Sequence, residues 1–312
     1  MAIYVAADFT PAEWAAWWPA LQAALPGERL LRTRSAADAA DPIDIALVAN
    51  PPAGSLRDLP GLRLVQSLWA GVERLLADPD LPTGVPVARM VDPALAEAMA
   101  QTALWAVLGL HRDFFRYAEQ QRMQHWATHP QRRAAAVRVG VLGLGEMGRA
   151  CAQRLAAAGY AVTGWSREPR QVDGCACVHG DAALDVVLGG AEIALNLLPL
   201  TPATRGLFDA ARLARLPAGA ALINLGRGDH VVDADLLAAL DAGRLRHAVL
   251  DVFAVEPLPP SHRYWTHPRV TLLPHVAAQT DPHSAAQVVA ANVCALREGR
   301  PIEHLVDRAT GY

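Results

Sequence analysis

The amino-acid sequence predicts an α/β protein with two domains, each built on a parallel sheet, and three observations lead to that prediction. Apolar runs of strand length alternate with amphipathic segments of helix length, as in successive β-α-β units. The alternation is interrupted once, at residues 92–136, and so divides into two sets of elements. A chain of 312 residues is long enough to bury two separate hydrophobic cores.

The first set of elements lies in residues 1–100. Its first helix has a well-marked start, because Thr10 can act as N-cap, Pro11 suits the first helical turn and Glu13 completes a capping box. Strands are expected at residues 2–7, 28–33, 43–49, 62–68 and 85–90. A last amphipathic helix, at residues 281–299, follows the second set, and we expect residues 284–312 to return and complete this first domain.

The second set of elements predicts a doubly wound parallel sheet within residues 101–283. Strands are expected at residues 137–142, 160–165, 191–198, 220–226, 246–253 and 269–274, separated by helical stretches. One long apolar-periodic helix at residues 92–121 and an irregular polar segment at residues 122–136 precede these strands. We predict that this helix and segment link the two domains.

Composition excludes several classes of function. The net charge is only −3 and the charges are spread along the chain, so no basic tract offers a footprint for nucleic acid. All 28 basic residues are Arg, and the lack of Lys excludes a Walker-type phosphate loop, a Schiff-base lysine and pyridoxal phosphate chemistry. The four cysteines fit no disulfide framework, and no segment resembles a signal peptide or a membrane span. We therefore expect a cytoplasmic protein with reduced thiols and no membrane partner.

The run GLGEMG at residues 143–148 directly follows a predicted strand and opens a helix. In that position Gly143 permits a tight turn, Gly145 lets the backbone approach a pyrophosphate, and Gly148 allows close packing of the helix on the strand. The spacing alone also fits a plain glycine-rich turn. Its strand-turn-helix context favours a dinucleotide site.

The end of the next strand bears on which dinucleotide would bind. An acidic residue for the adenosine ribose is expected about 20 residues after the glycines. That region reads Trp165, Ser166, Arg167, Glu168. Ser166 and Arg167 suit a 2′-phosphate, and Arg170 adds positive charge, so the pattern favours NADP. Glu168 keeps NAD open, and the arginines also fit an ordinary solvated surface.

Three chemically capable residues each follow a predicted strand of the second set: Arg227, Glu256 and His275. Because the carboxyl ends of parallel strands share one edge of the sheet, we expect these residues near the ligand crevice. An Arg can hold a carboxylate, and a His paired with a carboxylate keeps a proton that it can deliver to an oxygen. Each also fits a structural role, as an ion pair, a turn residue or a strand-end His. Together they favour the reduction of a 2-oxo acid.

Five motifs together resemble those of the D-isomer-specific 2-hydroxyacid dehydrogenases, from about Val65 to the C-terminus: GLGEMG, LPLTPATRGLF, INLGRG, LDVFAVEPLP and LLPHVAAQT. Within that family the segments TGWSR, HPRVTLLPHVAAQT and VDRATGY are most similar to the glyoxylate/hydroxypyruvate reductase A group. The resemblance implies a Rossmann dinucleotide-binding domain, a flavodoxin-like substrate domain made from both ends of the chain, and a homodimer.

The resemblance also implies roles for individual residues. Arg227 would bind substrate, Glu256 would support the acid-base residue His275, and Asp251 would contact the nicotinamide carboxamide. The substrate carboxylate would be held by the loop of Trp69, Ala70 and Gly71, where glycine lets the backbone come close. The implied cofactor contacts are Gly143, Leu144, Gly145, Glu146, Met147, Gly148, Trp165, Ser166, Arg167, Leu198, Pro199, Thr204, Leu225, Gly226, Asp251 and His275.

Two residues depart from the family pattern. Trp69 stands where a small residue is common, which predicts a narrower or differently shaped pocket. Gln101, in Met-Ala-Gln, replaces the Glu of a commoner Val-Ala-Glu near the nicotinamide, and its role stays open.

We therefore predict an enzyme that moves hydride from NADPH to the 2-carbon of a small 2-oxo acid, with glyoxylate and hydroxypyruvate as the leading substrates. A formate dehydrogenase shares the fold, but there the partner of the His is typically Gln, so Glu256 argues against it. A dinucleotide-sensing regulator of the same fold is the alternative from another class; it would bind cofactor without turnover.

Two other groups of residues have plainer interpretations. Trp14, Trp17 and Trp18, on the first helix, are expected in core or dimer packing. His125 and His129 imitate the spacing of a metal pair, but they lie in an irregular segment without a carboxylate partner. We predict no metal site.

Overall fold

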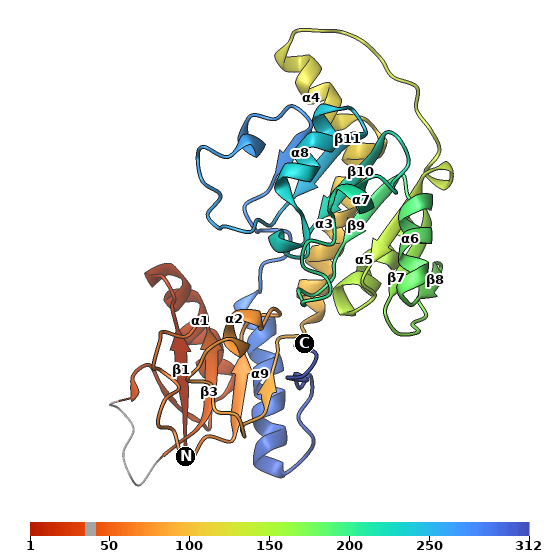
Figure 1. The fold of residues 1–312 in the computed structure, drawn as a ribbon. Coiled ribbons are helices and arrows are strands. Elements are labelled where there is room, and N and C mark those ends of the chain that lie inside the picture. Colours follow the sequence, from red (N-terminus) through yellow and green to blue (C-terminus); the bar gives the residue numbers. More distant parts are fainter. Residues whose placement is uncertain (35–41, 312) are drawn as a thin grey trace. The chain divides into compact units, whose positions relative to one another are not determined.

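A computed structural model describes residues 1–34 and 42–311 of the chain (Figure 1). The chain divides into two compact units. Unit 1 comprises Met1–Leu95 and Thr280–Tyr312, and unit 2 comprises Ala96–Gln279. Both units are built on parallel sheets with helices, so the predicted α/β class is confirmed.

Unit 1 contains a five-stranded parallel sheet in the order β2-β1-β3-β4-β5. Its elements are β1 (Ala2–Ala7), α1 (Pro11–Ala24), β2 (Arg29–Leu31), β3 (Ile43–Ala49), β4 (Leu64–Ser67), α2 (Glu73–Leu76), β5 (Val87–Ala88) and α9 (Pro282–Glu298). This order is that of flavodoxin-like sheets, whose ligand crevice lies at the carboxyl ends of the first and third strands, where the strand order reverses. The capping box of α1 is present, with the Thr10 N–H donating to Glu13 Oε2 over 2.7 Å.

The core of unit 1 explains why the C-terminal helix belongs to it. Apolar residues of α1 and α9, such as Leu21 and Val289, pack with Ile3 and Ile45 of the sheet in one buried cluster. Arg297 of α9 donates to both carboxylate oxygens of Glu28 over 2.8 Å. The helix therefore belongs to the first unit.

Unit 2 contains a seven-stranded parallel sheet in the order β12-β11-β10-β9-β6-β7-β8. Its strands are β6 (Arg138–Leu142), β7 (Ala161–Ser166), β8 (Ala176–His179), β9 (Ile193–Asn196), β10 (Ala220–Asn224), β11 (Leu245–Leu250) and β12 (Val270–Leu272). The order reverses beside β6, from which β7 and β9 extend on opposite sides. In such a sheet the ligand crevice lies outside the carboxyl ends of the strands at that point.

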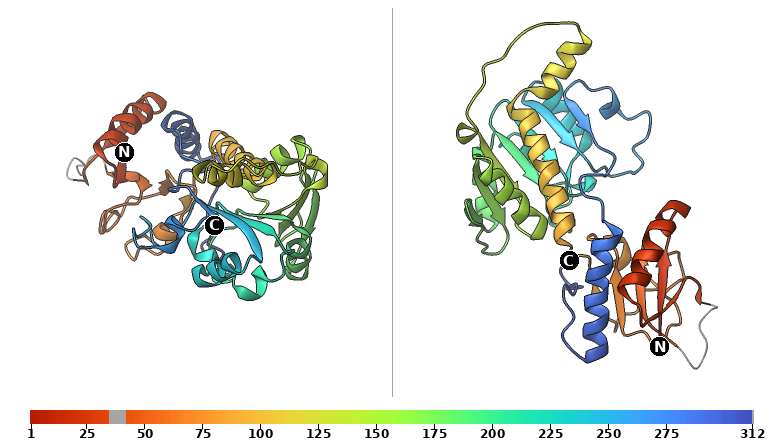
Figure 2. Two further views of the ribbon diagram at one scale, coloured as in Figure 1. Left: turned by 90° about the horizontal axis from the view of Figure 1, so that it is seen from above. Right: turned by 180° about the vertical axis from the view of Figure 1, so that it is seen from behind.

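Helices cover both faces of this second sheet (Figure 2). Residues of α3 (Pro93–His111) and α5 (Glu146–Ala157) share one buried cluster with the strands. Residues of α6 (Asp181–Gly190), α7 (Ala210–Leu213) and α8 (Asp233–Asp241) share the other. Short 3-10 turns occur at η2 (Ala134–Ala136), η3 (Gly228–His230) and η4 (Arg263–Trp265). The sheet is thus doubly wound, as predicted.

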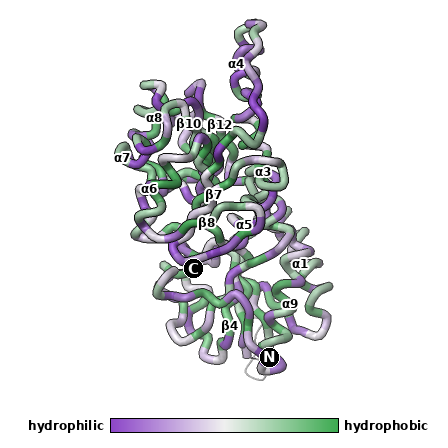
Figure 3. Tube along the Cα trace, turned by 90° about the vertical axis from the view of Figure 1, so that its right-hand side faces the viewer, coloured by the Kyte–Doolittle hydropathy of each residue, from purple (hydrophilic) through white to green (hydrophobic). Residues whose placement is uncertain are grey.

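Two predictions of secondary structure were wrong. The long helix expected at residues 92–121 is interrupted at Asp113, which has a left-handed φ of 57°, and the chain continues as α4 (Phe114–Arg122), a mainly hydrophilic helix (purple in Figure 3). The interruption lets Phe115 fold back against Gly109, where a Cβ would lie 2.5 Å from its ring. The edge strand β8 was not predicted, because its four residues, ACVH, are short and partly exposed.

Over the described part of the chain, the structure has no helix that is both long and apolar enough to cross a membrane. All four cysteines are free thiols.

Candidate active site

The glycine-rich turn joins β6 to α5 at the carboxyl edge of the unit 2 sheet. Gly143 has a φ of +96°, and a Cβ there would lie 3.0 Å from the Leu197 carbonyl oxygen. A Cβ on Gly148 would overlap the Gly143 carbonyl oxygen at 1.7 Å, so that position accepts glycine only. A Cβ on Gly145 would meet nothing within 4 Å. The first and third glycines therefore shape the turn, while the second leaves open space at the helix N-cap.

This turn fits a dinucleotide pyrophosphate. Gly145 is the N-cap of α5, and the first N–H groups of a helix have no partner within it and favour an anion. Glu146 is turned toward Arg149, whose Nη2 donates to it over 2.8 Å. Leu144 and Met147 pack in the apolar cluster between α3, α5 and the sheet. Any contact of these two residues with a cofactor would therefore come from the backbone.

The residues predicted to recognise the adenosine end close strand β7. Trp165 is buried, and its indole N–H donates to the Gly180 carbonyl over 2.9 Å. Ser166 is also buried, and its hydroxyl donates to the Glu168 carbonyl over 2.8 Å, which folds the chain tightly after the strand. Arg167 follows at the surface. The turn thus presents Arg167 at the carboxyl end of the strand beside the glycine-rich one.

The loop after β9 carries the next predicted cofactor contacts, Leu198, Pro199 and Thr204. The Thr204 hydroxyl donates to the Pro199 carbonyl over 2.8 Å and accepts the Thr201 N–H over 2.8 Å. Leu198 is buried. These hydrogen bonds fix the conformation of residues 198–204. The loop follows β9, the strand next to β6.

His275 and Glu256 form a hydrogen-bonded pair. His275 Nδ1 lies 2.7 Å from Glu256 Oε2, and the two side chains are 53% and 35% exposed. Glu256 Oε1 accepts the Phe253 N–H over 2.9 Å, so one oxygen is fixed by the backbone and the other faces the imidazole. A carboxylate at Nδ1 accepts a hydrogen bond from the ring and so favours the form with a proton on Nδ1. This arrangement can hold a proton and present it at Nε2.

Asp251 anchors the His275 segment. Asp251 is 1% exposed, and its carboxylate accepts the Val276 N–H over 2.7 Å and the Ala277 N–H over 3.0 Å. Its backbone carbonyl accepts the His275 N–H over 2.8 Å. His275 itself has a left-handed φ of 55°, which side chains other than glycine seldom adopt. The structure therefore places Asp251 behind His275, and the predicted contact with a nicotinamide stays a prediction.

The loop after β10 carries Arg227. The guanidinium Nη1 donates to the Gly226 carbonyl over 2.8 Å. Gly228 lies so close to the loop after β11 that a Cβ would be 1.9 Å from the Phe253 carbonyl carbon. This contact joins the loop of Arg227 to the loop that ends in Glu256. Leu225 is buried, so contacts with a ligand at Leu225 would be through the backbone.

Sequence reasoning missed Gly228 and the buried polar residues beneath this loop, which are Asn196, Asn224 and His230. The motif INLGRGDHVVD contains three of the four. In the sequence, Asn196 and Asn224 could have been recognised because each ends an apolar strand.

In unit 1, the predicted substrate loop follows β4. The Ser67 hydroxyl accepts the Trp69 N–H over 3.0 Å and donates to the Trp69 carbonyl over 2.9 Å. The Trp69 ring packs edge-on against Trp17 at 5.8 Å and against Phe9, which follows β1, at 6.1 Å. Trp69, Ala70 and Gly71 are partly exposed. The loop therefore lies at the carboxyl edge of the sheet, with an aromatic anchor.

The remaining residues of interest have structural surroundings. Trp17 is buried and Trp14 and Trp18 are partly buried, so the first-helix tryptophans pack in unit 1 as expected. Gln101 donates to Glu97 Oε1 over 3.0 Å. The His129 ring stacks on Tyr117 at 5.4 Å. Within residues 1–34 and 42–311, no group of three His, Cys, Asp or Glu side chains is arranged to hold a metal ion.

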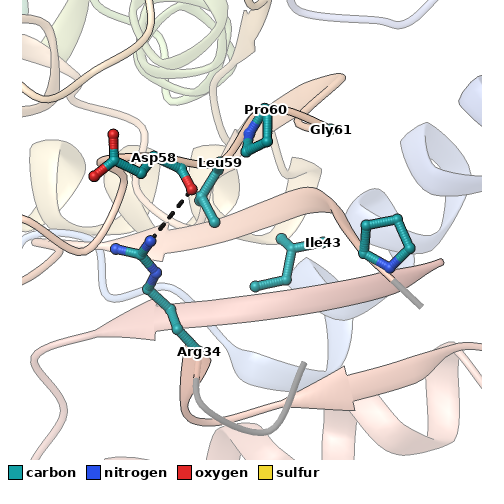
Figure 4. Close-up of a pocket in the computed structure, with 7 residues that line it drawn as sticks. Arg34, Ile43, Asp58, Leu59, Pro60 and Gly61 are labelled. Atoms are coloured by element: carbon teal, nitrogen blue, oxygen red, sulfur yellow. Dashed lines mark hydrogen bonds between the residues drawn. The ribbon is translucent and has the colours of Figure 1, made fainter. Parts of the chain in front are cut away.

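A hollow in unit 1 lies away from these residues. Arg34, Pro42, Ile43, Asp58, Leu59, Pro60 and Gly61 line it, and Arg34 Nη2 donates to the Asp58 carbonyl over 3.4 Å (Figure 4). Ile43 begins β3, so the hollow is at the amino edge of the sheet, opposite the edge where ligands bind in such folds. It contains none of the predicted site residues.

Comparison with known proteins decides the family. The profile of the D-isomer specific 2-hydroxyacid dehydrogenase NAD binding domain matches residues 104–277, more than half of the chain. The chain belongs to the D-isomer specific 2-hydroxyacid dehydrogenases. It is therefore an oxidoreductase, and the family predicted from the sequence motifs is confirmed.

Two curated relatives of this dehydrogenase match most of its length. It is 42% identical to the glyoxylate/hydroxypyruvate reductase A of Serratia proteamaculans over 87% of this chain and 88% of that one. It is 38% identical to the protein of the same name from Yersinia enterocolitica, over 95% and 96%.

Solved structures of the family have the same fold. A D-isomer specific 2-hydroxyacid dehydrogenase from Xanthobacter autotrophicus, in complex with NADPH and MES, superposes with a TM-score of 0.94 at 41% identity, over 100% of this chain and 99% of that one. An NADPH-dependent glyoxylate/hydroxypyruvate reductase from Sinorhizobium meliloti, with NADP and sulfate, superposes with a TM-score of 0.90 at 37% identity, over 99% of each chain. The predicted two-domain fold is thus confirmed.

Proposed function

We propose that this dehydrogenase uses NADPH to reduce small 2-oxo acids, with glyoxylate and hydroxypyruvate as the leading substrates. The observation that carries the proposal is the pair of His275 and Glu256, 2.7 Å apart at the carboxyl edge of the sheet that also holds the glycine-rich turn. The names of the two curated relatives and the NADPH or NADP in the two solved structures support the substrates and the cofactor.

In this proposal, His275 is the proton donor. NADPH, when bound, supplies a hydride to the carbonyl carbon of the oxo acid. The carbonyl oxygen then gains negative charge and takes the proton from Nε2 of the His275 imidazolium. Glu256 accepts Nδ1–H throughout, so the ring keeps one orientation before and after the transfer. The product is a 2-hydroxy acid and a neutral His275.

We assign Arg227 of unit 2 to binding of the substrate carboxylate, and the loop of Trp69, Ala70 and Gly71 is the substrate-binding loop that we assign in unit 1. A guanidinium binds a carboxylate through two parallel N–H groups, which fixes the plane of the oxo acid. The substrate domain is unit 1 and the dinucleotide-binding domain is unit 2 in this assignment, with boundaries at residues 95/96 and 279/280.

We assign the cofactor to the residues along the carboxyl edge of unit 2. The pyrophosphate binds at Gly145 and the first turn of α5, the 2′-phosphate at Arg167 and the backbone of Ser166, and the nicotinamide near Pro199 and Asp251. Arg167 at the end of β7 supports NADP, because a guanidinium matches a phosphate with charge and two donors. Glu168, one residue on, would support NAD.

We further propose a homodimer in the cytoplasm. Large apolar side chains of unit 2 are exposed on α3, on α4 and just after α4, where Trp105, Phe114, Met123 and Trp126 are 43%, 55%, 62% and 96% exposed. A contiguous exposed apolar patch is typical of an association surface, and we propose that these four side chains contribute to one. Light scattering should give twice the mass of the chain, and the variant Trp126→Ser should raise the dissociation constant of the dimer.

The test of the function is absorbance at the nicotinamide band with glyoxylate and hydroxypyruvate, with NADPH and NADH side by side. Fast oxidation of NADPH and weak oxidation of NADH are expected. In Arg167→Gln the preference for NADPH should fall about tenfold or more, while Arg263→Gln, which removes another surface Arg of unit 2, should keep it. An NADH preference in the wild type would transfer the ribose contact to Glu168. No turnover with either cofactor would contradict the proposal and favour a sensor.

A further inference from the structure

A buried polar cluster lies beneath the Arg227 loop of unit 2. Its members are Asn196 at the end of β9, Asn224 at the end of the neighbouring β10 and His230 in η3, and all three are 0% exposed. Buried polar side chains are costly unless each donor and acceptor finds a partner. These three residues lie beside the two loops that the proposed function assigns to substrate and to cofactor. Their hydrogen-bond partners show how the loops are held.

Backbone groups fix the orientation of both amides. Asn196 Oδ1 accepts the Leu198 N–H over 3.3 Å, so its Nδ2 is the atom that faces His230 and Asn224. Asn224 Oδ1 accepts the Gly226 N–H over 3.2 Å, and its Nδ2 donates to the Arg227 carbonyl over 2.9 Å. The Asn196 amide therefore presents a donor to His230.

His230 is held as one neutral tautomer by these partners. Its Nδ1 lies 2.8 Å from Asn196 Nδ2 and 3.2 Å from the Arg227 backbone nitrogen. Both partners are N–H donors, so Nδ1 accepts and carries no proton. Its Nε2 lies 3.2 Å from the Pro199 carbonyl oxygen, an acceptor, so the single proton is on Nε2.

His230 thereby connects two loops that come from different strands. On one side, it holds the Arg227 N–H, while Asn224 holds the Arg227 carbonyl. On the other side, it donates to Pro199, whose carbonyl also accepts from Thr204. A Cβ on Gly226 would lie 2.9 Å from Asn196 Nδ2 and 3.2 Å from His230 Nδ1, so the loop backbone lies directly on the cluster.

We propose that His230 is a positioning residue that sets the backbone of Arg227 and the backbone of Pro199 in one mutual arrangement. In this way the group that holds the substrate carboxylate and the loop that borders the nicotinamide keep a fixed spacing. The inference rests on the proposed function for the identity of the two ligands, and on the hydrogen bonds alone for the coupling of the loops. His230 touches neither ligand in this role.

Two substitutions separate the two connections. His230→Asn keeps an acceptor at the place of Nδ1 and loses the donor to Pro199. His230→Gln keeps a donor near the place of Nε2 and loses the acceptor for Arg227. His247→Gln is the control, because His247 is a partly buried His of the same sheet, bonded to Thr271 and outside both loops.

The two His230 variants should differ in the quantity that changes most, which is KM for glyoxylate in one and Kd for NADPH in the other. His230→Gln should raise KM for glyoxylate roughly 10- to 100-fold, since a small misplacement of a binding group has effects of that size. It should leave the Kd for NADPH, measured by fluorescence, within about twofold. His230→Asn should raise that Kd by about fivefold or more and change KM for glyoxylate less than His230→Gln does.

Amide hydrogen exchange without ligand tests the coupling independently of turnover. His230→Gln should speed exchange in residues 225–231, and His230→Asn should speed it in residues 198–206. If both variants loosen both segments equally, or if neither differs from His247→Gln, the proposal is overturned. If the wild type reduces no oxo acid but the exchange pattern divides as stated, the proposed function fails and the positioning role stands.

Discussion

Two loops at the carboxyl edges of two different sheets are held by opposite kinds of interaction. The loop after β4 in unit 1, with Trp69, is anchored by aromatic packing against Phe9 and Trp17. The loop after β10 in unit 2, with Arg227, is anchored by hydrogen bonds to Asn224 and His230, both 0% exposed. Under the proposed function, each loop carries residues for substrate binding.

The two kinds of anchor should respond differently to substitution. An aromatic pair contributes about 0.5–1.5 kcal/mol beyond its buried area and tolerates small changes in geometry. A buried hydrogen bond that loses one partner leaves an unsatisfied group at a cost of about 1–3 kcal/mol. We therefore expect graded effects in the first loop and abrupt effects in the second.

The largest effect is expected at His275, the residue that the unit 2 loops orient. His275→Ala removes the proton donor, so kcat should fall roughly 10²- to 10⁴-fold, the size of general acid catalysis. The Kd for NADPH should change little, because the side chain is exposed and its loop is held by Asp251. Steady-state kinetics and fluorescence titration measure the two quantities. Unimpaired turnover in this variant would refute the assignment of the proton donor.

Gly228→Ala tests how abruptly the second loop fails. The added Cβ would overlap the Phe253 carbonyl carbon at 1.9 Å, so the Arg227 loop and the Glu256 loop must separate. We expect kcat/KM to fall about 100-fold and the free energy of unfolding to fall by about 1–3 kcal/mol. The control is Gly190→Ala, since a Cβ at Gly190 meets nothing within 4 Å. Equal activity in the two variants would show that the loops are not coupled through Gly228.

A series at Trp69 tests the graded response of the first loop. Trp69→Phe keeps an aromatic ring against Phe9 and Trp17, while Trp69→Gly removes it. We expect KM for glyoxylate to rise about twofold in the first variant and about tenfold in the second, with preference moving toward the larger hydroxypyruvate. Trp18→Phe is the control, because Trp18 packs on Trp14 at the outer end of the same aromatic group. A full loss of activity in Trp69→Phe would remove the contrast between the loops.

The smallest effect that we expect is a decrease in the free energy of unfolding at acid pH, caused by a His in the unit 2 sheet. Burial, with a smaller contribution from nearby Arg246, lowers the pKa of His247 to about 4. Since the unfolded pKa is about 6.5, the unfolded chain binds the proton more readily, and stability is lost as pH falls from about 6.5 toward 4. Urea unfolding at pH 7.5 and pH 5 should show a decrease for the wild type that is smaller in His247→Gln. An equal decrease in both would assign the acid sensitivity to other groups.

Much of the fold could be predicted because it is encoded locally. The capping box of Thr10 and Glu13, the apolar runs of eleven strands and the glycines of the β6–α5 turn depend on neighbours within a few residues. The interruption of the long helix could not be predicted, since it depends on Phe115 meeting Gly109 in the folded chain. The same holds for β8, an edge strand defined by its pairing with β7.

For the candidate site, the sequence by itself determined which residue types follow which strands, and so nominated Arg227, Glu256 and His275 with the family that carries them. Only the tertiary structure decided that Glu256 faces Nδ1 of His275, that Asp251 fixes the backbone of the His275 segment, and that His230 joins two loops. The physical reason is that these bonds connect segments from separate strands. Their partners are chosen by the order of strands in the sheet, and that order is set by the packing of the whole unit.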